Sequence, residues 1–170
     1  QLLVTELPEV GPFQFQFHTQ IAEGNVTITE LKGNIEQAGP WQSLRIERGN
    51  VSVNEKRSIA ASIAALLDGT PLSLAVEGGD VAPQGADTNI WPLKIEASTS
   101  GATIKGDGII ATNESGKVLQ LTTHIFGNRF ESLGPLLGAS FPTVGKFDLQ
   151  ADISSDGTVH QANDLQIQIR

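Results

Sequence analysis

Apolar and polar residues alternate along most of this chain, which is the pattern of β-strands. The clearest case is residues 13–18 (FQFQFH), where three Phe residues are separated by polar ones. Successive side chains of a strand point to opposite faces, so the three Phe share one face. Val26 and Ile28 continue the alternation after a turn signal. Residues 31–35 then follow the opposite phase, which predicts a β-bulge near Thr29–Glu30.

The same pattern predicts nine further strands, joined mostly by short turn signals such as Asp68-Gly69. They are expected at 43–48, 50–53, 58–67, 71–77, 91–97, 102–112, 117–126, 145–153 and 158–169. Short turns between neighbouring strands predict hairpins, hence a largely antiparallel meander. The segment from Gly78 to Asn89 is rich in Gly, Asp and Pro and is expected to be a flexible loop. The fold class is therefore all-β.

One short segment favours a helix. Leu133, Leu136 and Leu137 have the i, i+3, i+4 spacing of a helix face, and Ser132 precedes them as a candidate N-cap. A single short helix is expected near 132–137.

Composition excludes several classes of function. Charged residues are 18% of the chain, below the usual ~25%, and apolar residues are 39%, so the chain can bury a core instead of staying disordered. The absence of Cys excludes disulfides, iron–sulfur clusters, thiolate zinc sites and thiol catalysis. A net charge of −8 without a basic cluster argues against nucleic acid. No run reaches the ~20 apolar residues of a membrane-spanning helix.

The candidate chemistry is sparse. Three histidines, each interpreted as a surface residue at a polar-face position, are His18, His124 and His160. None has a Ser or carboxylate at the spacing of a catalytic triad or metal site. The acid pairs Asp80/Asp87 and Asp152/Asp156 lack the ligand pattern of a calcium loop. We therefore expect no catalytic residue, no metal and no cofactor, and the chain is not expected to be an enzyme.

A repeat links the two ends of the sequence. The matching segments, each 134 positions apart, are Leu2-Leu3 with Leu136-Leu137, Pro8 with Pro142, Val10-Gly11 with Val144-Gly145, and Phe13 with Phe147. Leu31 and Ile35 match Leu165 and Ile169 at the same offset, whereas Gly24 and Val26 match Gly157 and Val159 at 133, as if the second copy had one extra residue in that strand. We interpret the chain as one fragment of a β array. It has a partial repeat at 1–37, central strands at 41–126 and a second partial repeat at 132–170.

These segments carry a family resemblance. Residues 133–138 (LGPLLG) and 141–149 (FPTVGKFDL) resemble the recurring segment of AsmA-like proteins, and residues 66–74, 91–95 and 104–108 resemble the central strands of that family. The resemblance implies a long, twisted periplasmic β-groove in a Gram-negative envelope protein, related to bridge-like lipid-transfer proteins. It further implies phospholipid transport toward the outer membrane. The parent protein would be anchored in the inner membrane by an N-terminal helix that these 170 residues do not contain.

One apolar face of the sheet is expected to line such a groove. Its predicted members are Phe13, Phe15, Phe17, Val26, Ile28, Leu72, Leu74, Val76, Leu93, Ile95, Leu119, Leu121, Ile125, Phe147, Leu149 and Ile153. A sandwich would cover this face with a second sheet, whereas a curled single sheet would leave a trough for acyl chains. Alternation fits both architectures, and the resemblance favours the twisted, curled single sheet. Trp41 and Trp91, each beside a proline, are expected to pack at strand ends.

Three hypotheses follow for function. The leading one is a groove that binds or conducts phospholipid between the inner and outer membranes and supports outer-membrane homeostasis. A second is a β-sandwich interaction module of structural or adhesin-like type, with no lipid groove. A third, an enzyme acting on polysaccharide, requires convergent carboxylates, and none stands out. Unpaired sheet edges should also pair with flanking repeats of the parent chain or with a second copy.

Overall fold

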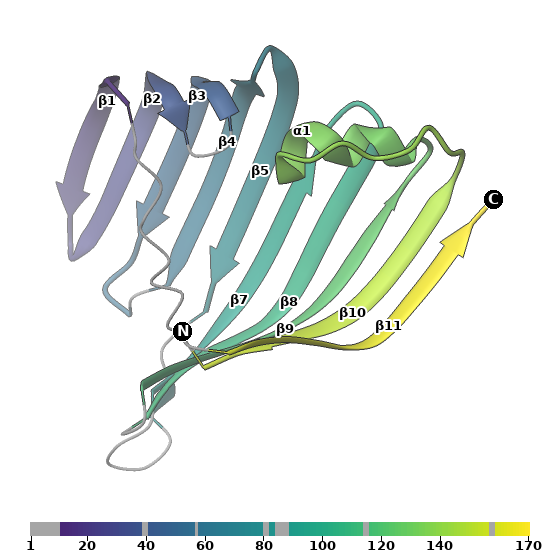
Figure 1. Cartoon of the computed structure of the whole chain (residues 1–170). Coiled ribbons are helices and arrows are strands. Elements are labelled where there is room, and N and C mark those ends of the chain that lie inside the picture. Colours follow the sequence, from purple (N-terminus) through teal and green to yellow (C-terminus); the bar gives the residue numbers. More distant parts are fainter. Residues whose placement is uncertain are drawn as a thin grey trace.

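The computed structural model describes residues 11–38, 41–56, 58–79, 82–83, 89–113, 116–156 and 159–170, and these form a single antiparallel sheet (Figure 1). The strands are β1 (Phe13–Ala22), β2 (Asn25–Ala38), β3 (Trp41–Val53), β4 (Ile59–Leu67), β5 (Thr70–Gly78), β6 (Ala82–Pro83), β7 (Asn89–Ser98), β8 (Ala102–Asn113), β9 (Gly116–Gly127), β10 (Phe147–Ser155) and β11 (His160–Ile169). The strand order is β1-β2-β3-β4-β5-β7-β8-β9-β10-β11, and the two-residue β6 pairs with β7.

This arrangement confirms the predicted all-β meander built as one open sheet. Within the described residues each of the ten ordered strands pairs antiparallel with its neighbours, the order has no crossover, and the sheet does not close on itself. There is no second layer of strands in the described part of the chain. The sandwich alternative is therefore wrong for these residues.

Strand register gives the sheet two chemically different faces. On the first, which we call the apolar face, apolar side chains form rows across the strands, as in the row Ile35, Leu44 and Leu67 on β2, β3 and β4. On the second, the polar face, Lys94 pairs with Asp107 (Nζ to Oδ2, 3.5 Å) between β7 and β8. This pair is largely solvent-exposed, and such pairs contribute little to stability. The polar face is therefore the one suited to water.

Glycines on the apolar face make room for large side chains. A Cβ atom added to Gly33 would lie 2.2 Å from Cδ1 of Phe15, and one added to Gly78 would lie 1.9 Å from Cζ2 of Trp91. Both contacts are too short for any real side chain. Small residues beneath aromatic rings let the strands bend toward this face, which favours the curl of the sheet in Figure 1.

The predicted bulge in β2 is confirmed. Gln16 faces Lys32 and His18 faces Thr29, so Phe17 alone faces the two residues Glu30 and Leu31. Glu30 has a φ of 54°, the left-handed conformation that many bulges need. The extra residue reverses the phase of β2, which is why the alternation changes along the sequence.

A second irregularity corrects the prediction for β3. The sequence predicted two strands, 43–48 and 50–53, but the structure has one strand, Trp41–Val53. Its register against β4 shifts between Ile46 and Arg48. The shift changes the alternation phase within a continuous strand, so the sequence pattern divides it into two.

The predicted helix is present as two short pieces, η1 (Phe130–Leu133) and α1 (Gly134–Leu137). Ser132 does not cap it: neither piece has a side-chain cap, and Ser132 lies inside η1. Instead Pro135 stands in the first turn of α1, and Gly138 ends the helix with a φ of 62°. Proline at the start and a left-handed glycine at the end are favourable positions for both residues.

The two hairpins at the ends of the sheet pair in the same register, 134 positions apart. Phe13 faces Ile35 in the first, and Phe147 faces Ile169 in the second. The offset remains 134 at the far end, where Ile21 faces Val26 and Ser155 faces His160. The predicted extra residue in the second copy is therefore wrong, and so is the match of Val26 with Val159.

Two further predictions concern a long loop and membrane-spanning helices. Of the predicted loop Gly78–Asn89, residues 80–81 and 84–88 lie outside the described residues, while 82–83 form β6. Among the residues described, no helix combines the length and hydropathy needed to cross a membrane.

Candidate functional site

The sixteen residues predicted to line a groove all lie on the apolar face. On β9 and β10, Leu149 faces Ile125 and Ile153 faces Leu121. On β5 and β7, Val76 faces Ile95. The members on β1 and β2 join the same face, because Phe13 faces Ile35, which faces Leu44 in turn. Register therefore brings together residues that are spread over most of the sequence.

The predicted set missed a whole section of this face. Further apolar-face residues on β3 and β4 are Leu44, Ile46, Val51, Val53, Ile59, Ile63 and Leu67, with Ile104 and Ile110 on β8 and Leu165, Ile167 and Ile169 on β11. The signal in β4 was present as Ile59, Ile63 and Leu67 at even spacing. Alanines between them, and Leu66 on the polar face, hid the alternation.

The apolar face is crowded toward its helical end and open at both edges. Phe147, at the start of β10, is 4% exposed, whereas Ile21 on β1 is 74% exposed and Leu165 on β11 is 59% exposed. In the described residues, cover comes from the helical pieces and from neighbouring side chains. Large apolar side chains are therefore left facing solvent along both edge strands.

The helical segment, residues 130–138, packs onto the apolar face near one end of the strands (Figure 1). Leu133 is its anchor, 2% exposed, in a cluster with Ala102 and Phe147. The ring of Phe130 meets the rings of Phe141 and Phe147 edge-on, each at a centroid distance of 5.1 Å. Edge-to-face pairs of this kind add about 0.5–1.5 kcal/mol beyond area burial. This end of the face is thus a packed core.

Trp41 ties the same segment to a distant strand. Its indole Nε1–H, at the start of β3, donates a hydrogen bond to the carbonyl oxygen of Pro135. The helical segment therefore contacts β8 and β10 through its apolar cluster and β3 through this bond. Trp91 packs against Gly78, so both tryptophans occupy packing positions.

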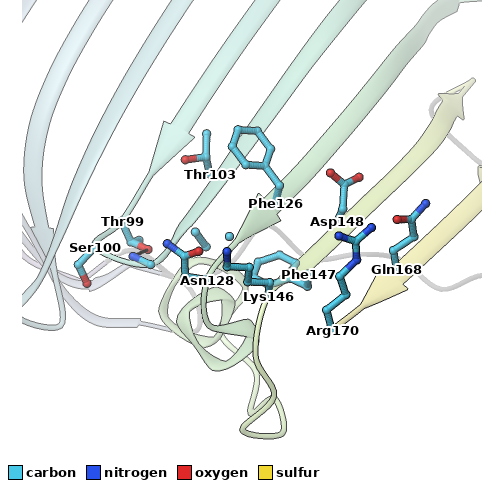
Figure 2. A pocket seen from close by; sticks show the side chains of 13 residues that line it. Thr99, Ser100, Thr103, Phe126, Asn128, Lys146, Phe147, Asp148, Gln168 and Arg170 are labelled. Carbon is cyan, nitrogen blue, oxygen red and sulfur yellow. Dashed lines mark hydrogen bonds between the residues drawn. The ribbon is translucent and has the colours of Figure 1, made fainter.

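The polar face has a hollow of about 580 Å³ at the ends of β8–β11 (Figure 2). Four residues cross its floor in one row: Thr103, Phe126, Asp148 and Gln168. Lys146 and Arg170 also line it, and Figure 2 shows the guanidinium of Arg170 directed toward Asp148. The hollow is open, and its floor lies on the opposite face of the sheet from the predicted groove.

Asp148 has a lowered pKa. Its Oδ2 lies 2.9 Å from Nε2 of His124. That hydrogen bond is the main cause that lowers the pKa of Asp148, with smaller contributions from the charges of His124 and Arg170. Asp148 is an exposed carboxylate held in its ionised form. Among the residues that the structure describes, no group of three or more His, Asp or Glu is placed to hold a metal ion.

The histidines are placed as predicted with one exception. His18 lies on the polar face, with Nδ1 3.1 Å from Oε2 of Glu30, and His124 is on the same face. His160 faces Ser155, which faces Leu119, so it belongs to the apolar face. The prediction for His160 is wrong because β11 has its own bulge at Asp164 (φ 52°), which reverses the phase of the residues before it.

Comparisons with protein-family models, with curated proteins and with solved structures find no match to this chain. The resemblance to AsmA-like proteins thus stays a prediction from the sequence motifs.

Proposed function

We propose that the apolar face binds the acyl chains of phospholipid, and that this chain is a segment of a periplasmic AsmA-like protein. In that protein the face conducts phospholipid between the inner and outer membranes and supports outer-membrane homeostasis. The role is transport without catalysis or cofactor. The observation that carries the proposal is a single open sheet whose apolar face has no second sheet over it in the described residues.

The physical basis is the hydrophobic effect alone. Each buried methylene contributes roughly 0.8 kcal/mol, so an acyl chain can be held without any specific polar contact. Rows of Phe, Leu, Ile and Val cross the face from strand to strand. A lipid tail moving along such rows exchanges one apolar contact for another, which keeps the energy similar at successive positions.

The most accessible part of this face lies along the edge strands. Phe17 on β1 and Leu165 on β11 are more than half exposed. We therefore place the first contacts with lipid there, and not beside Leu133, where the helical segment already fills the face. The polar face, with its ion pairs, remains in water.

Adjacent positions on β1 allow a matched test. A photo-crosslinking amino acid is placed at Phe17 on the apolar face or at Gln16 on the polar face, and each protein is irradiated with vesicles of phosphatidylethanolamine and phosphatidylglycerol. Intact-mass spectrometry should find a phospholipid adduct at position 17 and little at position 16. Equal labelling at both positions, or none at 17, would overturn the proposal.

A further inference from the structure

In the part of the chain that the structure describes, the sheet ends in two long strands. Among the described residues, β1 and β11 each pair with a neighbour on one side only. Both are 10 residues long. Together they contain no Lys, Arg, Glu or Pro, and Asp164 is their one acidic residue. Natural edge strands are often protected from pairing by charge, proline, short length or a bulge. These two edges have little of the first three, and β11 has one bulge, at Asp164.

The side chains of the two edges complement one another. Read in antiparallel directions, β1 and β11 match in residue type on both faces of the sheet. The apolar-face matches are Phe13 with Ile169, Phe15 with Ile167 and Phe17 with Leu165, and the polar-face matches are Gln14 with Gln168, Gln16 with Gln166 and His18 with Asp164. The last pair places the imidazole of His18, which already lies 3.1 Å from Glu30, near a second carboxylate.

The backbone groups are in phase for the same register. Glu36 N donates to Pro12 O at 3.0 Å, and Arg170 N donates to Lys146 O at 2.8 Å. Hydrogen-bonded pairs alternate along an antiparallel ladder. The even-numbered residues 14 and 168 therefore bond inward, and the N–H and C=O groups of 13, 15, 167 and 169 point to the free edges. When Phe15 faces Ile167, the residues whose N–H and C=O groups point outward on the two strands therefore face each other.

We propose that β11 of one copy of this chain pairs antiparallel with β1 of a second copy, with Phe15 facing Ile167. Hairpin β10–β11 matches β1–β2 at an offset of 134. The free edge of β11 thus corresponds to the edge of β2 that binds β3, and the free edge of β1 to the edge of β10 that binds β9. Each free edge has a counterpart that is paired inside the same molecule.

This contact is head to tail, so it does not close by symmetry. Each added copy covers one free edge and presents a new edge of the same kind, so the product is a linear series of sheets. The apolar faces of successive copies lie on the same side, because Phe residues of β1 meet Ile and Leu residues of β11. The proposal concerns these 170 residues by themselves and does not require lipid binding; in the longer protein of the proposed function, flanking repeats would occupy the same two edges.

Two variants that each block one edge test the polarity of this contact. Phe15→Pro removes an outward N–H from β1 and leaves β11 intact, whereas Ile167→Pro does the reverse; proline is tolerated on strand edges. In sedimentation velocity the unsubstituted 170-residue chain should form concentration-dependent oligomers, and each variant alone should be monomeric. A mixture of the two should give a 1:1 dimer. The proposal would be overturned if Ile167→Pro alone formed dimers or if the mixture stayed monomeric. It would also be overturned if the unsubstituted chain were monomeric at millimolar concentration.

A second pair of variants keeps the test independent of any folding defect from proline. Gln16→Lys with Gln166→Lys puts like charges opposite each other across the contact, and Gln16→Lys with Gln166→Glu puts opposite charges there. The dissociation constant should be larger for the first variant than for the second, by up to about fivefold, since cross-strand pairs differ by up to about 1 kcal/mol. Asn34→Lys, on the inner strand β2, is the control and should leave association unchanged. Equal constants for the two double variants would contradict the register.

Discussion

The two hairpins at the ends of the sheet share their backbone pairing and differ in what covers their apolar side. Phe13 and Phe147 occupy equivalent positions, facing Ile35 and Ile169, yet Phe13 is 68% exposed and Phe147 is 4% exposed. The helical segment packs against the second hairpin through Leu133 and Phe130. Within the described residues the first hairpin has no such cover. Local sequence therefore specifies register, while burial depends on a separate segment.

The comparison is sharpest at the two phenylalanines. Phe147→Ala should lower the free energy of unfolding by about 3–5 kcal/mol, because it opens a cavity beneath Leu133 and Phe130. Phe13→Ala should cost less than about 1 kcal/mol, since its ring is mostly in solvent. Urea denaturation of both variants measures the difference. Equal losses would mean that the burial contrast between the hairpins is not present in solution.

Two glycines at equivalent positions should instead show equal effects, because the two hairpins share their backbone geometry. A Cβ atom at Gly11 would lie 2.1 Å from the carbonyl oxygen of Glu36, and one at Gly145 would lie 2.5 Å from that of Arg170. Gly11→Ala and Gly145→Ala should therefore each lower the free energy of unfolding by about 1–3 kcal/mol, the range for overpacking. The two losses should be similar. Thermal unfolding of the pair is the measurement. A large loss for one and none for the other would show that the two hairpins are not equivalent in backbone.

Trp41 tests whether the cover of the second hairpin is tied down from β3. Trp41→Phe keeps an aromatic ring but removes the Nε1–H that donates to Pro135, which should cost about 0.5–1.5 kcal/mol. Amide hydrogen exchange should become faster in residues 130–138 while β1 and β2 stay as they were. Unchanged exchange in the helical segment would argue that the bond contributes nothing to its docking.

The smallest expected effect concerns charge at equivalent polar positions, Asp148 in the second hairpin and Gln14 in the first. The pKa of Asp148 is lowered in the folded chain, first by its hydrogen bond with His124. A carboxyl with a depressed folded pKa contributes stability above its ordinary unfolded pKa, and that stability is lost as pH falls through the folded value. Asp148→Asn should therefore reduce the melting temperature slightly at about pH 6 and not at about pH 2. Gln14→Asn serves as the control and should show no such pH dependence; a loss at Asp148 that is the same at both pH values would refute the assignment.

Alternation along the sequence was sufficient to predict which face most side chains take. It gave the antiparallel meander, the bulge at Glu30 and the shared face of Phe13 and Phe147. It failed at two other places where an extra residue reverses the phase inside a strand: β3 was divided in two, and His160 was assigned to the wrong face because of the bulge at Asp164.

Burial was the part that alternation could not supply. A strand pattern shows which face is apolar, but it does not predict which segment of the chain covers that face. The docking of Leu133 and the bond from Trp41 to Pro135 join residues far apart in the chain. Neither has a local pattern that predicts it. The expected cap by Ser132 was wrong for a local reason, because Ser132 lies inside η1 and Pro135 and Gly138 define the ends of α1.

The uncrossed strand order has a consequence for how such a chain can change in length. Every strand after the first docks on the one made just before it, with only the two-residue β6 off the path. A sheet built in this way can grow by duplication of a hairpin, because no existing connection has to be rerouted. The ribosome can also complete it progressively, each new hairpin finding its template already in place. Both properties allow a sheet of this kind to be lengthened hairpin by hairpin.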